Sequence, residues 1–213
     1  MSGGSPLGRP RLHLRSVGST NQRARELAAA GAPHGALVTA AEQTAGRGRQ
    51  GRPWVTPPGR ALLMSLVLRE WPRLLPLAAG VAVAEECGPD AAIKWPNDVL
   101  VGAGKVAGIL AEGRPREGWI VLGVGVNVAL RPDDLPPELR TTASGLGRPP
   151  AALEPSLASL LERLQHWLAA SPEQILEAVR ARDALAGREV RWAGGSGVAA
   201  GEVHLDAPEA LRR

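Results

Sequence analysis

One polar segment of the chain, residues 43–54, combines the residue types that bind anions. It alternates Gly46, Arg47, Gly48, Arg49, Gly51 and Arg52. Glycine lets the backbone approach a ligand closely, and the planar guanidinium group of arginine engages phosphate or carboxylate oxygens in pairs. Residues 43–69 hold five arginines and no acid. The segment therefore predicts an anion-binding loop; a solvated basic loop or an RNA-binding segment is the alternative.

A second polar cluster, Lys94-Trp95-Pro96-Asn97-Asp98, follows further along the chain. Pro96 has a fixed φ and biases Trp95 toward extended backbone, so the neighbouring side chains are held in defined directions. Lysine, asparagine and aspartate together suit a phosphate, a sugar or a hydrated Mg²⁺. The alternative is a turn around a buried tryptophan.

Lysine is rare in this chain, since Lys94 and Lys105 are the only two among 25 basic residues. Lys105 opens an apolar stretch at 105–112, where a lysine is in most proteins a solvated strand end. Asparagine is equally rare and occurs at positions 21, 97 and 127. All five residues fall in polar segments, so they are candidates for positions that do not tolerate substitution.

Several other chemistries are excluded by spacing. Residues 102–105 lack both the leading glycine of a P-loop and the Ser or Thr after its lysine, and Gly123-Val124-Gly125 is followed by Val128 where a dinucleotide fingerprint needs glycine. Cys87 ends an apolar run, so we expect it to be a core residue and not a nucleophile. The four histidines show no metal-ligand spacing with cysteine or carboxylates.

The composition is that of a globular protein, with 44% hydrophobic and 22% charged residues in 213. A single cysteine excludes a disulfide framework and fits a reducing compartment. No apolar run is long enough for a membrane span, and the chain does not begin with a signal-like apolar segment. We therefore expect a cytoplasmic protein. The net charge of +4 comes from scattered arginines and is weak support for nucleic-acid binding.

Strand and helix patterns interleave without a strict βαβ rhythm, which predicts an α+β fold with a mixed sheet and helices on one face. Strands are expected at 12–17, 36–41, 61–68, 92–94, 98–101, 105–112 and 119–128. Helices are expected at 22–30, 74–87, 153–168 and 172–185, the first capped by Ser19 or Thr20. Segment 43–54 is expected to hold no regular structure. After a proline-rich connection at 131–150, residues 188–205 predict a small β appendage.

Five of these segments, taken in order, resemble the catalytic domain of biotin protein ligases. They are residues 18–21, 46–54, 94–98, 105–112 and 123–127. The resemblance extends over 12–130 and less specifically to the end. It implies a mixed β-sheet flanked by helices, related to class II aminoacyl-tRNA synthetases, followed by an SH3-like domain. We accordingly divide the chain into a catalytic domain at 1–185 and a short SH3-like domain at 186–213.

The resemblance also implies a reaction in two steps. Biotin's carboxylate attacks the α-phosphorus of MgATP, giving biotinyl-5′-AMP and pyrophosphate. A lysine of a biotin carboxyl carrier protein, an acetyl-CoA carboxylase subunit, then displaces AMP. The implied biotin-binding residues are Ser19, Thr20, Asn21, Gln43, Arg47, Gly48, Arg49 and Lys105. The implied ATP-binding residues are Arg49, Arg52, Trp54, Lys94, Asn97 and Asn127.

Among these residues, Arg47, Arg49 and Lys105 are the expected catalytic ones, because fixed positive charge offsets the repulsion between carboxylate and triphosphate. Trp54 is expected near adenine. No metal site built by the protein alone is expected, and Asp98 is the side chain that would touch a nucleotide-bound Mg²⁺. The glycine-rich segment 46–54, called the glycine loop below, is expected to become ordered over the bound adenylate.

Only 18 residues precede Ser19, too few for the DNA-binding domain of bifunctional family members, so we expect a monofunctional ligase that binds neither DNA nor membrane. The chain ends at Arg213, which is early for a complete SH3-like barrel. A lipoate- or octanoate-type ligase, an inactive biotin-binding homologue and a nucleic-acid-binding module remain as alternatives. A homodimer formed through sheet edges is left open.

Overall fold

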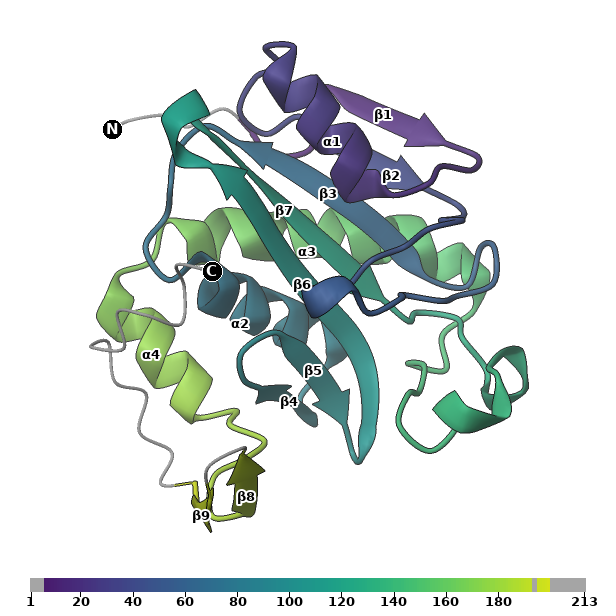
Figure 1. Ribbon diagram of the computed structural model, residues 1–213, viewed down its shortest axis with the longest axis vertical. Helices are drawn as coiled ribbons and strands as arrows, with labels where there is room; N and C mark the ends of the chain where they lie inside the picture. Colours follow the sequence, from purple (N-terminus) through teal and green to yellow (C-terminus); the bar gives the residue numbers. More distant parts are fainter. Residues whose placement is uncertain (1–5, 193–194, 200–213) are drawn as a thin grey trace.

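A seven-stranded mixed sheet forms the centre of the computed structural model, which describes residues 6–192 and 195–199 (Figure 1). The strand order is β1-β2-β3-β7-β6-β5-β4; β1 and β2 are parallel and all other neighbours antiparallel. The strands are β1 (Arg11–Leu14), β2 (Leu37–Ala40), β3 (Leu62–Leu68), β4 (Ala91–Lys94), β5 (Asp98–Val101), β6 (Gly104–Arg114) and β7 (Trp119–Val126). The α-helices are α1 (Thr20–Ala29), α2 (Leu75–Cys87), α3 (Leu153–Leu168) and α4 (Pro172–Arg180). The predicted α+β mixed sheet is confirmed.

Helices cover both faces of the sheet, so the prediction of helices on one face is wrong. Val67 and Val121 pack with Ala24 of α1, while Leu66 and Leu122, their neighbours in β3 and β7, face the core under α2, α3 and α4. Figure 1 shows α1 and α3 on opposite sides of the strands. The reason is that every residue of β3 is buried, and a strand apolar on both sides needs cover on both sides.

Helix α1 begins at Thr20, two residues before the predicted start, and its cap is one of the two predicted residues. Ser19 is the N-cap, and its hydroxyl oxygen accepts a hydrogen bond from the Gln22 amide at 3.5 Å. Thr20 and Asn21 fall in the first turn and are buried against the sheet, whereas a helix start in solvent would expose them. The cap thus fixes the position at which the Thr20 and Asn21 side chains are buried.

Helix α2 lies between the sheet and helices α3 and α4, and nearly all of its residues are buried. Cys87 ends it, and burial raises the pKa of its thiol to about 12. The prediction that this cysteine belongs to the core is confirmed. Within the described part of the chain, no helix is both long enough and apolar enough to cross a membrane.

The C-terminal elements differ in part from expectation. Helix α4 ends at Arg180 and not at 185, because the chain then joins the free edge of the sheet, where Asp183 bridges Ile93 and the Ala184 amide donates to the Ile93 carbonyl at 2.9 Å. Strands β8 (Glu189–Trp192) and β9 (Gly195–Val198) form a separate antiparallel hairpin. The rest of the predicted appendage lies outside the described residues, and the domain boundary at 185 stays a prediction.

Candidate functional site

A cavity opens between the start of α1, the glycine loop, the β4–β5 turn, and strands β6 and β7. It brings together every predicted site residue except Lys94 and Asn127. Those in its lining are Ser19, Thr20, Asn21, Gln43, Arg47, Gly48, Arg49, Arg52, Trp54, Asn97, Asp98 and Lys105. Residues far apart in sequence thus form one site, although their roles toward a ligand remain predictions.

At one end of the cavity, neutral polar side chains in the lining join Ser65 and the Glu112 carboxylate in a hydrogen-bonded network. The Gln43 side-chain oxygen accepts from the Thr20 amide at 2.7 Å and from the Thr20 hydroxyl at 3.0 Å. Ser65 Oγ lies 2.9 Å from Thr20 Oγ1 and donates to Asn21 Oδ1 at 2.6 Å. Asn21 Nδ2 in turn donates to the Glu112 carboxylate at 2.9 Å. The first turn of α1 is therefore locked to three strands or loops at once.

Ser65 belongs to this network and was not among the predicted site residues. It is 0% exposed and sits in the middle of β3, opposite Gly123 of β7. A single hydroxyl among apolar residues on a fully buried strand was the available signal, because such a group needs a hydrogen-bond partner in the core. Close packing explains the glycine at position 123, because a Cβ there would overlap the Asn21 side chain.

The network fixes the direction of its hydrogen bonds, apart from that of the Thr20 hydroxyl. Asn21 points its amide nitrogen at Glu112, so its oxygen faces Ser65 and can only accept. The Ser65 proton is used on Asn21, and the Thr20 hydroxyl donates to Gln43 or to Ser65. Lone pairs of the Thr20 oxygen are left over. This end of the cavity therefore offers an acceptor to an N–H group of a ligand.

The other end of the cavity is charged. Lys105 Nζ lies 2.7 Å from Asp98 Oδ1, which also accepts from Asn97 Nδ2 at 3.0 Å. Arg49 Nη1 donates to Asn97 Oδ1 at 3.4 Å, so the glycine loop reaches the β4–β5 turn. Lys105 and Asp98 are both partly exposed, so an incoming anion can compete for the lysine.

Trp54 also lines the cavity. A Cβ on Gly108 or Gly125 would come within 2.9 Å of its indole, so the ring lies on two glycines of β6 and β7. Lys105 Nζ lies 5.4 Å from the centroid of the same ring. The Trp54 Nε1 group is buried and finds no hydrogen-bond partner in the described part of the chain.

The glycine loop has more structure than predicted. The Gly48 amide donates to the Arg52 carbonyl at 2.7 Å and the Trp54 amide to the Gly46 carbonyl at 2.9 Å, which closes a small hairpin. A 3₁₀ turn over Arg49–Gly51 forms its tip, so the prediction of no regular structure is wrong there. The tip turns because Gln50 and Gly51 both have positive φ, and the glycine meets that demand without strain.

The cavity carries an excess of positive charge. Four basic side chains line it, at positions 47, 49, 52 and 105, against the single carboxylate of Asp98. Among residues 6–192 and 195–199, Arg47, Arg49 and Arg52 form no ion pair with an acid. Arginines without an acidic partner attract a polyanion into a site that also offers neutral polar groups.

Two predicted residues lie elsewhere. Lys94 is exposed and outside the cavity lining. Asn127 is 3% exposed and donates to the backbone carbonyls of Ser144 at 2.9 Å and Lys105 at 3.5 Å. The alternative reading of the second cluster, a turn around a buried tryptophan, is wrong, because Trp95 is 53% exposed. The described residues contain no group of three histidine, cysteine, aspartate or glutamate side chains placed to hold a metal ion.

Comparison with known proteins gives consistent matches. Residues 14–127 match the model of the biotin/lipoate A/B protein ligase family. A biotin–[acetyl-CoA-carboxylase] ligase of Mycobacterium tuberculosis is 37% identical over 193 residues, covering 82% of this chain and 71% of that protein. The bifunctional ligase/repressor BirA of Bacillus subtilis is 39% identical over 154 residues, covering 67% of this chain. The chain matches 47% of the length of that second relative.

The fold comparison agrees with the sequence comparison. A solved structure described as the biotin protein ligase from Aquifex aeolicus in complex with biotin and ATP superimposes with a TM-score of 0.76 at 27% identity. The match covers 88% of this chain and 84% of that one.

Proposed function

Because the chain belongs to the biotin/lipoate A/B protein ligase family, we propose that it activates biotin with ATP and transfers it to a lysine of a biotin carboxyl carrier protein. One observation carries the proposal: a single cavity joins a neutral polar end to a cationic end, with Lys105 at the cationic end. Such a cavity suits a substrate with an uncharged polar ring and a carboxylate, held beside a triphosphate.

The first step joins two anions. An oxygen of biotin's carboxylate forms a bond to the α-phosphorus of ATP, and the bond from that phosphorus to the pyrophosphate oxygen breaks. Lys105 turns from Asp98 to the carboxylate and to the charge that develops on the α-phosphate. Arg49 and Arg52 neutralise phosphate oxygens. Alignment and fixed charge supply the catalysis, and no protein nucleophile is needed.

In the second step the acceptor lysine's ε-amine attacks the acyl carbon of biotinyl-5′-AMP. The bond from that carbon to the phosphate oxygen breaks, AMP leaves with that oxygen, and the amine loses a proton. The acceptor we propose is the carrier subunit of an acetyl-CoA carboxylase, in the cytoplasm. The glycine loop would close over the adenylate between the two steps and exclude water.

The neutral end of the cavity determines which carboxylic acid the site prefers as substrate. Thr20 offers an oxygen lone pair to a ureido N–H, and its orientation is held by Gln43 and Ser65. The Trp54 indole covers Gly108 and Gly125 and forms an aromatic part of the cavity lining. A lipoyl chain has no N–H group for this acceptor, so we place biotin ahead of lipoate.

Mg²⁺ fits the cationic end only as a nucleotide-bound ion. Asp98 is the one carboxylate in the cavity lining, and Mg²⁺ keeps most of its coordination for water and phosphate oxygens. When bound, the ion would neutralise phosphate charge. Asp98 and Asn97 supply the side-chain oxygens within reach of it.

The test is biotin-dependent exchange of labelled pyrophosphate into ATP, with purified protein, Mg²⁺ and no carrier. We expect exchange with biotin and none with lipoate or octanoate. Exchange with lipoate alone would replace biotin by a lipoyl-type substrate. Failure of both acids, in protein that calorimetry shows to be folded, would contradict the adenylation step.

Arg49→Gly is expected to accelerate the release of biotinyl-5′-AMP. Arg49 ties the loop to Asn97 and faces the phosphate end, and losing a charge-assisted contact of this type costs about 1.5–3 kcal/mol. Dissociation of preformed adenylate, followed by stopped-flow fluorescence, should therefore be about 10- to 100-fold faster.

Gln50→Gly is the matched control for that variant. Gln50 lies next to Arg49 with φ of 58°, so glycine fits the same backbone and no charge is lost. Release from this variant should match the wild type. Equal acceleration in both variants would assign the effect to loop flexibility and remove the proposed role of the Arg49 charge.

A further inference from the structure

We infer that Glu112 of β6 sets the hydrogen-bonding capacity of the neutral end of the cavity, although it is not part of the cavity lining. It acts through Asn21, whose side-chain amide it holds in one orientation. The inference rests on the proposed function, in which this end of the cavity binds an N–H group of the substrate. Glu112 is therefore a positioning residue for the choice of acid.

The Asn21 amide has two orientations of nearly the same shape, and Glu112 decides between them. A carboxylate only accepts hydrogen bonds, so the amide nitrogen and not the oxygen must face it. Glu112 Oε2 lies 2.9 Å from Asn21 Nδ2, whereas the second acceptor of that nitrogen, the Leu110 carbonyl, lies 3.3 Å away. The shorter, charge-assisted bond is the stronger one, so Glu112 contributes most to the orientation.

The orientation of the Asn21 amide determines how much of the Thr20 oxygen is free for a ligand. With its nitrogen on Glu112, the Asn21 amide accepts the Ser65 proton at 2.6 Å. Ser65 then has no proton to give to Thr20, which lies 2.9 Å away and keeps both lone pairs of its hydroxyl oxygen. In the other orientation the Asn21 nitrogen would donate to Ser65, and the Ser65 proton would turn to Thr20 and occupy one of these lone pairs.

Arg25 of α1 engages the same carboxylate from the other side. Its Nη1 atom donates to Glu112 Oε1 at 3.3 Å, so the two carboxylate oxygens serve different partners. Both side chains line a separate groove between α1 and the β6–β7 hairpin. An ion pair as exposed as this one contributes little by itself, so the function of Glu112 lies in its bond to Asn21.

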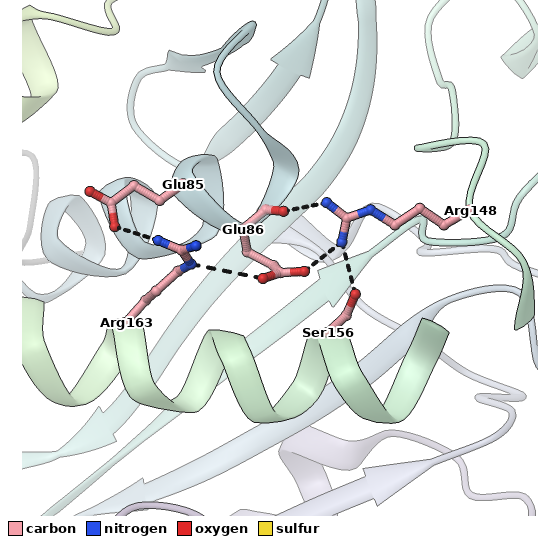
Figure 2. Close-up of polar contacts among 5 residues, drawn as sticks. All are labelled: Glu85, Glu86, Arg148, Ser156 and Arg163. Carbon is pink, nitrogen blue, oxygen red and sulfur yellow. Dashed lines mark hydrogen bonds and ion pairs between the residues drawn. The ribbon is translucent and has the colours of Figure 1, made fainter. Parts of the chain in front are cut away.

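A second ion pair, in the helical layer on the other face of the sheet, provides a matched control. Figure 2 shows Arg163 of α3 reaching Glu85 of α2, at 3.2 Å, with 38% and 27% of the two side chains exposed. Arg25 and Glu112 lie 3.3 Å apart, with 39% and 36% exposed. The two pairs thus match in length, charge and exposure. Of the two acids, Glu112 is the one that also bonds to the cavity lining.

The experiment compares Glu112→Leu, Glu112→Gln and Glu85→Leu in the intact protein by pyrophosphate exchange. Leucine has similar bulk but no acceptor, whereas glutamine keeps one acceptor oxygen for Asn21. We expect Glu112→Leu to raise KM for biotin by about 10- to 100-fold, because it leaves a buried donor without a good partner. KM for ATP and kcat at saturating biotin should stay within about twofold, as for a loss of binding alone. Glu112→Gln and Glu85→Leu should retain the wild-type KM for biotin.

A second measurement needs no substrate. Asparagine occurs only at positions 21, 97 and 127, so isotope labelling of asparagine side chains gives a simple NMR spectrum, in which Asn21→Asp identifies the Asn21 amide. Hydrogen exchange of this amide should be at least about 10-fold faster in Glu112→Leu than in the wild type, since the bond to the carboxylate protects the donor. Glu112→Gln and Glu85→Leu should keep the slow exchange.

Three results would overturn the inference: a normal KM for biotin in Glu112→Leu, equal increases in Glu112→Leu and Glu85→Leu, or an unaltered exchange rate of the Asn21 amide. Should Glu112→Leu not fold, Glu112→Ala removes the same acceptor and takes its place in the comparison. The amide measurement decides whether Glu112 holds Asn21 even if the protein activates another acid. Absence of pyrophosphate exchange in the wild type would instead count against the proposed function.

Discussion

Lys105→Ala is expected to lower biotin-dependent pyrophosphate exchange by at least about 10²- to 10³-fold, the cost of removing one donor that stabilises developing charge. Lys105 is the one lysine in the cavity lining, and Asp98 holds its ammonium group in place before substrate arrives. The measurement is steady-state exchange at saturating ATP and biotin, with folding checked by thermal unfolding.

The fold should tolerate this change. The pair with Asp98 is partly exposed and contributes at most about 1 kcal/mol, so the melting temperature should fall by about 2–4 °C or less. Lys94→Ala removes the same charge from an exposed position outside the lining and should cost far less activity. Equal losses in the two lysine variants would show that net charge matters, and Lys105 would lose its assigned role.

Gly123→Ala is expected to weaken biotin binding by about 10²-fold. The new methyl group overlaps the Asn21 side chain, which must leave its place on the sheet and give up its bonds to Ser65 and Glu112. Breaking hydrogen bonds in a buried network costs about 1–3 kcal/mol for each group left without a partner. Calorimetric titration with biotin measures the change directly.

Gly80→Ala separates this effect from a general intolerance of glycine replacement. Gly80 is buried in α2, and a Cβ there meets its nearest neighbour, a methyl group of Ile93, at an ordinary 3.7 Å. The substitution should stabilise the protein by about 0.5–1 kcal/mol and leave biotin affinity unchanged. Normal biotin affinity in Gly123→Ala would contradict the role given to Asn21 and its network.

The features that the sequence alone determined depend on residues that are close together in the chain. The capping of α1 by Ser19 and the apolar strands follow from neighbouring residues, and the structure confirms the cap and the strands. The order of the five motif segments predicted one common site. Each of the five contributes residues to the cavity lining, although Lys94 and Asn127 lie outside it.

Only the tertiary structure decided the contacts between strands that are distant in sequence. Ser65 meets Asn21 across 44 positions because α1 lies on β3 and β7, and no local pattern specifies which hydroxyl of β3 faces it. The placement of α1 on the second face of the sheet is of the same kind.

Asn127 shows the difference most clearly. Its residue type and its place in a motif marked it as a site residue, yet it lies outside the cavity lining and its side-chain nitrogen donates to the carbonyls of Lys105 and Ser144. That direction depends on the register of β6 with β7 and on a connection that returns to pair with both. Register and chain return are long-range properties, set by which buried faces fit together, so they emerge only when the whole sheet is assembled.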